Sequence, residues 1–365
     1  MKTYFTSESV TPGHPDKVCD QIADAILDEA LRQDREAHMA VEATIKDNFV
    51  LLYGEAGTKA VLDYPAIAKA VLKDIGYFED FEVLVKISKQ SAEIDAAVVN
   101  RESLGAGDQG IMFGYACDET KGYMPLSISL AHQLSRQLTK VYKEQSEAIL
   151  KPDGKTQVTV TYQDKKIAYL DSIVVSAQHE ASITQETLRD YIIEKVITPV
   201  VPPALIHADT KFFINPSGSF VVGGPFGDSG TTGRKIVVDT YGGHGRIGGG
   251  CLSSKDPSKV DRSAAYYCRY VAKNIVAAGL AKRFEIQVSY AIGMPKPLSV
   301  EIETFGTGTV SDEAILKIIE NNFDFSVANI IDSLDLKRPI YRATSNFGHF
   351  GRSEFPWEQI IDLKR

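Results

Sequence analysis

Two short stretches mix aspartate with lysine in a pattern that suits a magnesium–phosphate site. Residues 13–17 read GHPDK and contain Asp16, and residues 254–262 read SKDPSKVDR and contain Asp261. A helical pattern follows each stretch, and helix N-termini attract anions through free N–H groups and the helix dipole. Carboxylates can coordinate Mg²⁺ while lysines contact phosphate oxygens. Taken singly, each aspartate is more simply interpreted as a capping residue; the occurrence of two mixed turns favours a phosphate site.

A glycine-rich stretch, residues 223–235 (GGPFGDSGTTGRK), suggests a loop whose backbone approaches an anion closely. It does not match a P-loop, because Gly233 is followed by Arg234 and Lys235 and then by IVVDTY, which predicts a strand and not a helix. In isolation, a plain turn between strands is the simpler interpretation. His14 precedes the first mixed turn, where a histidine can stabilise charge on a leaving oxygen.

Residues 243–248 (GHGRIG) fit the G-x-G-x-x-G pattern of dinucleotide-binding folds. The pattern follows an expected strand, but GGGCLSSKD comes next and opens no helix. The acidic residue that should end a strand about 20 positions later is also missing, because Asp261 lies inside an expected helix. A Rossmann dehydrogenase is therefore disfavoured.

Composition describes an ordinary globular enzyme with an acidic balance. The chain has 365 residues, which suggests two or three domains, and its formal net charge is −8. An acidic chain is a poor candidate for a nucleic-acid or membrane-surface binder, so we expect neither partner. Residues 234–262 are a local exception, with six Lys or Arg against three Asp.

Cysteine usage and the N-terminal residues favour the cytoplasm. Cys19, Cys117, Cys251 and Cys268 form no C-x-x-C pair and no metal-ligand spacing, as is typical of reduced thiols. Residues 1–17 contain no apolar signal-peptide core, and no apolar run approaches transmembrane length.

The order helix, hairpin, helix recurs three times, with starts near residues 15, 128 and 257. The first long helix carries an apolar stripe at Val18, Ile22, Ile26 and Ala30. Repeats more than 100 residues apart are the size of domains, not of solenoid units. The predicted fold class is α+β, with three similar domains, each a β-sheet with packed helices.

Three acidic positions receive structural interpretations from local pattern alone. Asp256 is expected to N-cap the third long helix, with Pro257 as its first residue. Glu42 alternates with Val41 and Ala43 on a strand, which is typical of a solvent-facing residue. Glu55 at a strand end has the same interpretation.

Longer motifs closely resemble the S-adenosylmethionine synthetase (methionine adenosyltransferase) family. They lie at residues 13–28, 105–116 (GAGDQGIMFGYA, with Asp108), 211–218 (KFFINPSG), 223–243 and 254–281. The resemblance implies three pseudo-threefold-related domains, at 1–95, 106–222 and 223–365. It also implies a homotetramer, a dimer of dimers, with active sites between subunits. The implied reaction converts ATP, L-methionine and water to S-adenosylmethionine, phosphate and diphosphate, with Mg²⁺ and K⁺ as cofactors.

The resemblance implies an ATP site made of cations, polar residues and one aromatic ring. His14 corresponds to the histidine near the ribose 5′ oxygen, and Phe220 to the ring that stacks on adenine. The expected catalytic residues are His14, Lys155, Arg234, Lys235 and Lys255. The other expected ATP contacts are Asp153, Ser219, Asp228 and Cys251.

The resemblance also implies a methionine pocket and two kinds of metal site. The pocket residues are Glu55, Gln90, Asp228 and Lys259. Asp16 and Asp261 correspond to the magnesium carboxylates, and Glu42 to the potassium ligand. The chain departs from the family pattern at residues 89–94, which read KQSAEI instead of KQSPDI in the segment that resembles the active-site lid, and at Ser219, where relatives can carry arginine.

This chemistry accounts for the residue types. A methionine thioether is a neutral nucleophile that needs no general base, and it must displace a highly charged triphosphate. Catalysis then depends on alignment and on stabilising the leaving group's charge, which calls for cations and one histidine. A nucleotide-dependent kinase or ligase and a non-catalytic ATP-sensing module remain as alternatives.

Overall fold

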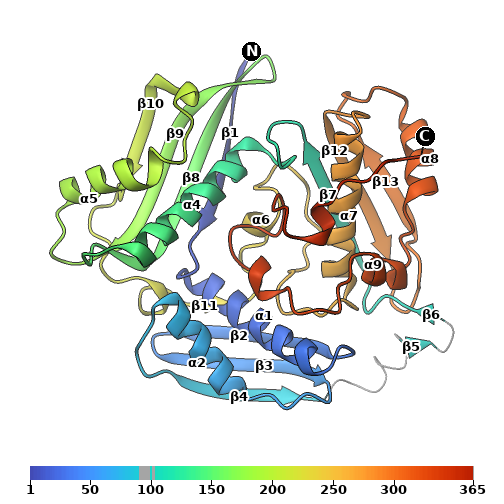
Figure 1. Cartoon of the computed structure of the whole chain (residues 1–365), viewed down its shortest axis with the longest axis horizontal. Helices are drawn as coiled ribbons and strands as arrows, with labels where there is room; N and C mark the ends of the chain where they lie inside the picture. Colours follow the sequence, from blue (N-terminus) through green and yellow to red (C-terminus); the bar gives the residue numbers. More distant parts are fainter. Residues whose placement is uncertain (90–98, 101–102, 365) are drawn as a thin grey trace.

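The computed structural model describes the chain except residues 90–98, 101, 102 and 365, and within that range three main sheets carry packed helices (Figure 1). Each sheet is built on one of the predicted hairpins. These are β2 (His38–Lys46) with β3 (Phe49–Gly57), β8 (Leu150–Gln163) with β9 (Lys166–His179), and β12 (Arg283–Tyr290) with β13 (Ser299–Glu303). All three hairpins are therefore confirmed.

A long helix precedes each hairpin and a shorter one follows it. The long helices are α1 (Pro15–Gln33), α4 (Leu126–Glu144) and α7 (Val260–Ala277). The shorter ones are α2 (Tyr64–Ile75), α5 (Gln185–Ile192) and α8 (Asp312–Asn322). In the first two repeats the short helix leads to a strand parallel to the second hairpin strand, β4 (Glu82–Ser88) or β10 (Ile206–Ile214). The α+β class with three related units is confirmed.

The three units exchange strands in a ring. The chain's first strand, β1 (Lys2–Val10), pairs antiparallel with β8 of the second unit. From the second unit, β7 (Gly110–Cys117) pairs with β12 of the third. From the third, β11 (Gly230–Thr231) pairs with β2 of the first. Each sheet therefore begins with a strand from another unit, and the domain boundaries expected from sequence stay a prediction.

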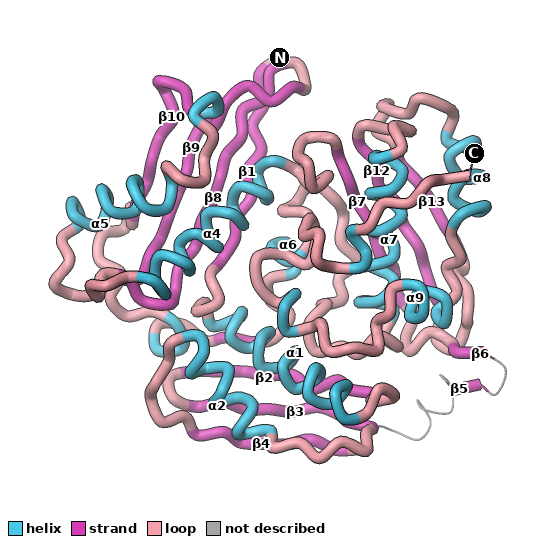
Figure 2. Tube along the Cα trace, in the orientation of Figure 1, coloured by secondary structure: helices cyan, strands magenta, loops and turns pink. Residues whose placement is uncertain are grey.

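The long helices lie on the inner sides of the sheets, around a short helix, α6 (Ile236–Asp239), and the C-terminal segment (Figure 2). The apolar stripe of α1 is confirmed, because Val18, Ile22, Ile26 and Ala30 are all fully buried. The first and third units share one continuous apolar core, which also includes residues of β7 and Ile128 of α4, while the rest of the second unit has its own core. Unusually, the other face of α1 is also buried, and it carries polar residues toward the third unit.

The predicted start of the third long helix is wrong. The helix begins at Val260, with Lys259 as N-cap and no side-chain capping bond. Asp256 bonds elsewhere: its carboxylate accepts the backbone N–H of Met39 at 2.7 Å and that of Ser258 at 2.8 Å. A local turn and a contact with β2 therefore take the place of the predicted cap.

The strand predicted after Lys235 is also wrong. Residues 236–239 form the single helical turn α6, in which the Asp239 N–H bonds to the Lys235 carbonyl at 2.9 Å. The G-x-G-x-x-G stretch therefore does not follow a strand. Buried neighbours override the β-branched residues here, because Val238 and Asp239 are both 2% exposed at the centre of the molecule.

Candidate active site

His14 caps the start of α1. Its Nδ1 accepts the backbone N–H of Asp16 at 3.2 Å, so the ring hydrogen of the neutral form lies on Nε2. Burial, together with the nearby Lys235 and Lys155, lowers the pKa of His14 to about 3. His14 is thus a neutral hydrogen-bond donor at physiological pH.

Asp16, in the first turn of α1, is surrounded by donors. Its Oδ1 accepts the N–H of Thr231 at 3.0 Å, and its Oδ2 accepts Lys235 Nζ at 2.8 Å. Arg234 lies 3.6 Å from Oδ1. Burial alone would raise the pKa of Asp16, but the hydrogen bonds from Lys235 and Thr231 outweigh it and lower that pKa. The predicted grouping of Asp16, Arg234 and Lys235 is therefore present in the fold.

The two cations belong to a loop whose backbone is held tightly. Gly233 has φ +79°, a left-handed conformation that favours glycine, and a side chain there would overlap Cys251. Arg234 keeps about half of its side chain exposed (52%), whereas Lys235 is 18% exposed. The guanidinium can therefore reach a ligand from solvent while its backbone stays fixed.

Asp153 and Phe220 of the second unit contact two consecutive glycines, Gly224 and Gly223. Asp153 is 7% exposed, and its Oδ2 accepts the N–H of Gly224 at 2.7 Å. Its Oδ1 is buried and has no hydrogen-bond partner among the described residues. Burial raises the pKa of this carboxyl to about 6. The Phe220 backbone N–H donates to His179 Nε2 at 3.1 Å, and the Phe220 ring lies close to Gly223.

The predicted nucleotide residues on either side of this pair are open to solvent. Lys155, on β8, pairs with Val10 and is exposed, and Ser219 and Asp228 are exposed as well. The charges of Lys155 and Asp228 both influence the pKa of His14, which Lys155 lowers and Asp228 raises. These side chains are free to contact a ligand over the start of α1.

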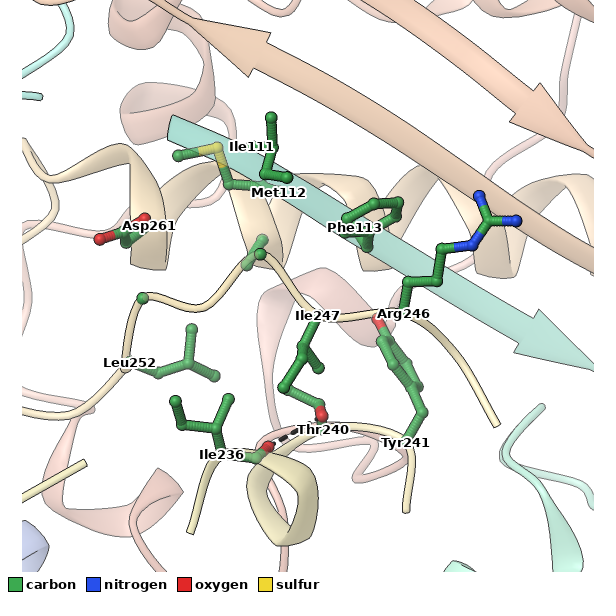
Figure 3. A pocket seen from close by; sticks show the side chains of 13 residues that line it. Ile111, Met112, Phe113, Ile236, Thr240, Tyr241, Arg246, Ile247, Leu252 and Asp261 are labelled. Atoms are coloured by element: carbon green, nitrogen blue, oxygen red, sulfur yellow. Dashed lines mark hydrogen bonds between the residues drawn. The ribbon is translucent and has the colours of Figure 1, made fainter. Parts of the chain in front are cut away.

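A second group surrounds Asp261. Lys255 forms an ion pair with Asp261, and a side chain at Gly250 would overlap the Asp261 carboxylate. Figure 3 shows Asp261 at the edge of a pocket whose other walls are largely apolar, including Ile236 and Leu252. Burial raises the pKa of the neighbouring Cys251, which also senses Lys255 and Glu42. Glu42 itself accepts the Tyr53 hydroxyl at 3.1 Å.

The group around Asp16 and the group around Asp261 both contact the same edge of β2. Thr231 pairs with Thr44 of this strand, and Lys255 bridges to Ala40. Four residues of strand span about 13 Å, so the two loops meet the same edge at that separation. Glu42 lies between them, half-buried on the face that also carries Ala40 and Thr44.

The predicted methionine residues are only partly brought together. Glu55 is exposed on β3, opposite Ala40. Lys259 forms an ion pair with Asp256, which bonds to β2 at Met39. In the described chain, no hydrogen bond or ion pair joins Glu55, Lys259 and Asp228. Gln90 lies outside the described residues, as do Ala92 and Glu93, the two departures from the family pattern.

The carboxylates suit a metal that is completed by a ligand. In the part of the chain that the structure describes, no three His, Cys, Asp or Glu side chains are arranged to hold a metal ion. Asp16 and Asp261 each face cations instead. Mg²⁺ is often bound by one or two carboxylates together with substrate phosphates. Both aspartates fit that role.

Sequence reasoning missed a ladder of aspartates on the inner face of α1. Asp16, Asp20, Asp24 and Asp28 recur every four residues, and all four are buried. Each accepts backbone N–H groups from the third unit. The donors are Thr231 to Asp16, Gly233 to Asp20, Ser254 to Asp24, and Tyr341 and Arg342 to Asp28. The spacing of four was a visible signal, but only burial distinguishes such a ladder from a solvated helix face.

Comparison with known proteins shows which family the chain resembles. Models of the S-adenosylmethionine synthetase N-terminal, central and C-terminal domains match residues 2–99, 103–220 and 222–359. An S-adenosylmethionine synthase of Clostridium botulinum (strain Alaska E43 / Type E3) is 51% identical over 385 aligned residues, which cover 100% of this chain and 98% of the relative. Among the described residues, no helix is long and apolar enough to span a membrane. The chain therefore belongs to the S-adenosylmethionine synthetase family, and its activity is that of a methionine adenosyltransferase.

Proposed function

We propose that the methionine sulfur attacks the 5′ carbon of ATP, and that the tripolyphosphate released is then hydrolysed to diphosphate and phosphate in the same site. The observation that carries this proposal is the group at the start of α1. There, Lys235 and Arg234 face Asp16 beside a neutral His14. A cationic loop with one neutral donor suits a reaction that needs charge stabilisation and no general base.

In this proposal the first step depends on His14. As the C5′–O5′ bond breaks, negative charge develops on the 5′ oxygen, and the His14 Nε2–H donates to it. Arg234, Lys235, Lys155 and Lys255 bind the phosphate oxygens. Phe220 stacks on adenine, while Asp153, Ser219 and Cys251 contact the nucleotide. Support comes from the buried Asp153 carboxyl, since one of its oxygens has no partner among the described residues.

The second substrate and the ions complete the site. Glu55, Gln90, Asp228 and Lys259 bind methionine. Asp16 and Asp261 bind Mg²⁺, which supplies charge neutralisation to the phosphates, and Glu42 binds K⁺. We further propose that the enzyme is a homotetramer, a dimer of dimers, with active sites between subunits. We place the enzyme in the cytoplasm, with no nucleic-acid or membrane partner.

Product analysis tests the proposal. Purified protein with ATP, L-methionine, Mg²⁺ and K⁺ should yield a methionine-derived sulfonium, diphosphate and phosphate. ADP or AMP as the main nucleotide product would instead indicate a kinase or ligase. Binding of ATP without turnover would indicate a sensing module, and either result would overturn the proposal.

A further inference from the structure

A buried charged trio lies directly beneath the cationic loop. Lys17 bonds to Asp20 Oδ2 at 3.0 Å and forms an ion pair with Asp239. Lys17 and Asp20 are 0% exposed and Asp239 is 2% exposed. None of the three contacts solvent enough to meet a ligand, so none is a direct binding group. We call Lys17, Asp20 and Asp239 the loop clamp.

The clamp holds the backbone on both sides of Arg234 and Lys235. On one side, Asp20 Oδ1 accepts the N–H of Gly233 at 2.8 Å. On the other, the N–H of Asp239 closes the α6 turn onto the Lys235 carbonyl at 2.9 Å. The Lys17 ammonium links the two sides, because it contacts the carboxylates of both Asp20 and Asp239. A shift of α1 or of α6 would therefore move both cations together.

Stability alone is a weak reason for such a trio. Burying several charges carries a desolvation penalty that mutual attraction often fails to repay, and apolar replacements are frequently as stable. A network that fixes a geometry has a different rationale, because a catalytic cation must be held within a fraction of an ångström. The neighbouring contact is consistent with this, since Lys235 reaches Asp16 at 2.8 Å.

We propose that Lys17 and Asp20 are positioning residues for the phosphate site, which orient Arg234 and Lys235 by holding their loop through Gly233 and Asp239. This inference rests on the proposed function, because it assigns the loop to the triphosphate. It extends that function to residues that touch no substrate.

Asp28 provides a matched control. It lies on the same face of the same helix, is 8% exposed, and accepts two backbone N–H groups, at 2.8 Å from Tyr341 and 2.9 Å from Arg342. Residues 341 and 342 have no role in the proposed site. Loss of Asp28 therefore removes a similar structural contact without touching the cationic loop.

The test compares Asp20→Ala and Asp20→Asn with Asp28→Ala and Asp28→Asn in the full-length protein. Tripolyphosphate binding is measured by calorimetry with Mg²⁺ and a non-hydrolysable tripolyphosphate analogue, so that cleavage adds no heat, together with kcat, the KM for each substrate and the unfolding midpoint. Asp20→Ala should weaken tripolyphosphate binding and lower kcat by about 10²-fold, the effect of a misplacement near 1 Å, with the methionine KM little changed. Asp20→Asn, which keeps an acceptor for Gly233, should recover part of the loss.

Equal effects of the Asp20 and Asp28 variants, or unchanged tripolyphosphate binding in Asp20→Ala, would overturn the inference. If Asp20→Ala does not fold, the two Asn variants decide: a larger loss of tripolyphosphate affinity in Asp20→Asn supports the clamp, and equal losses refute it. If the wild-type protein makes no sulfonium, the proposed function is wrong. The comparison of tripolyphosphate binding between the Asp20 and Asp28 variants still tests the loop clamp in that case.

Discussion

The two aspartates proposed to bind magnesium lie in contrasting surroundings. Asp16 is 2% exposed and is held by a backbone N–H, a lysine and a nearby arginine, beside a capping histidine. Asp261 is 21% exposed and pairs with Lys255. Both occupy the first turn of a long helix, so the helix position is the same while the packing differs. Asp16 is held in place before a ligand binds by the loop that contains β11. The more exposed Asp261 can still adjust to a ligand.

The largest expected effect is at the start of α1, where His14 and Asp16 lie. His14→Ala should reduce S-adenosylmethionine formation by about 10²–10³-fold, the usual effect of losing one well-placed donor. Cleavage of added tripolyphosphate should suffer much less, because it breaks a bond remote from the 5′ oxygen. Arg234→Ala, in contrast, should impair tripolyphosphate cleavage markedly. Both activities are measured on both variants, with gel filtration to verify assembly. Equal losses of both activities in the His14 variant would refute its role as a 5′-oxygen donor.

The comparison predicts unequal consequences for the two aspartates. Asp16→Asn should raise the Mg²⁺ concentration needed for half-maximal activity by about 10- to 100-fold and lower turnover, because it also leaves Lys235 without its buried partner. Asp261→Asn should fall at the lower end of that range. Magnesium titrations of both variants measure this difference. An unchanged titration in Asp16→Asn would remove Asp16 from the metal site, and equal shifts would remove the proposed contrast.

Glu42, between the two loops, should show a narrower effect. Glu42→Gln keeps the size of the side chain and its contact with Tyr53 but removes the charge. Activation by K⁺ should be lost while the activity without K⁺ stays near that of the wild type. Assays across a K⁺ series, with Na⁺ at constant ionic strength, measure it. A full K⁺ response in the variant would return Glu42 to a plain strand residue.

The smallest effect concerns pH. Since burial lowers the pKa of His14 to about 3, its neutral form persists as the pH falls from 8 toward 5, and protonation sets in only near pH 3. His14→Asn cannot titrate and retains a good N-cap. The ratio of wild-type to variant transfer rates should therefore be constant between about pH 5.5 and 8. A change in that ratio, in either direction, as the pH drops below about 6.5 would show that His14 titrates normally and would contradict the assigned environment.

Periodicity predicted the hairpins and long helices because each has one dominant apolar face. The α1 stripe and the alternation of Val41, Glu42 and Ala43 both follow the period of their element. The predicted helix cap at Asp256 and the predicted strand after Lys235 were wrong, because segments that are distant in sequence bond to or pack against these residues. The Asp256 carboxylate bonds to Met39, and residues 236–239 turn into a helix at the packed centre.

Much of the chemistry was also accessible from residue types. The mixed turns around Asp16 and Asp261 and the loop ending in Arg234 and Lys235 indicated a phosphate site, and the family motifs indicated which reaction it serves. The grouping of Asp16 with the loop cations required the structure, because these residues lie more than 200 positions apart.

The sequence by itself determined the repeated helix–hairpin–helix units and the residue types of the site, because periodicity and composition are local properties. Only the tertiary structure decided the exchange of strands around the ring and the position of both cationic loops on the edge of β2. It also decided that Asp20 and its neighbours on α1 are buried against the third unit. Such contacts depend on which surfaces meet, and no local pattern specifies the partner of an exposed strand edge or of a polar helix face.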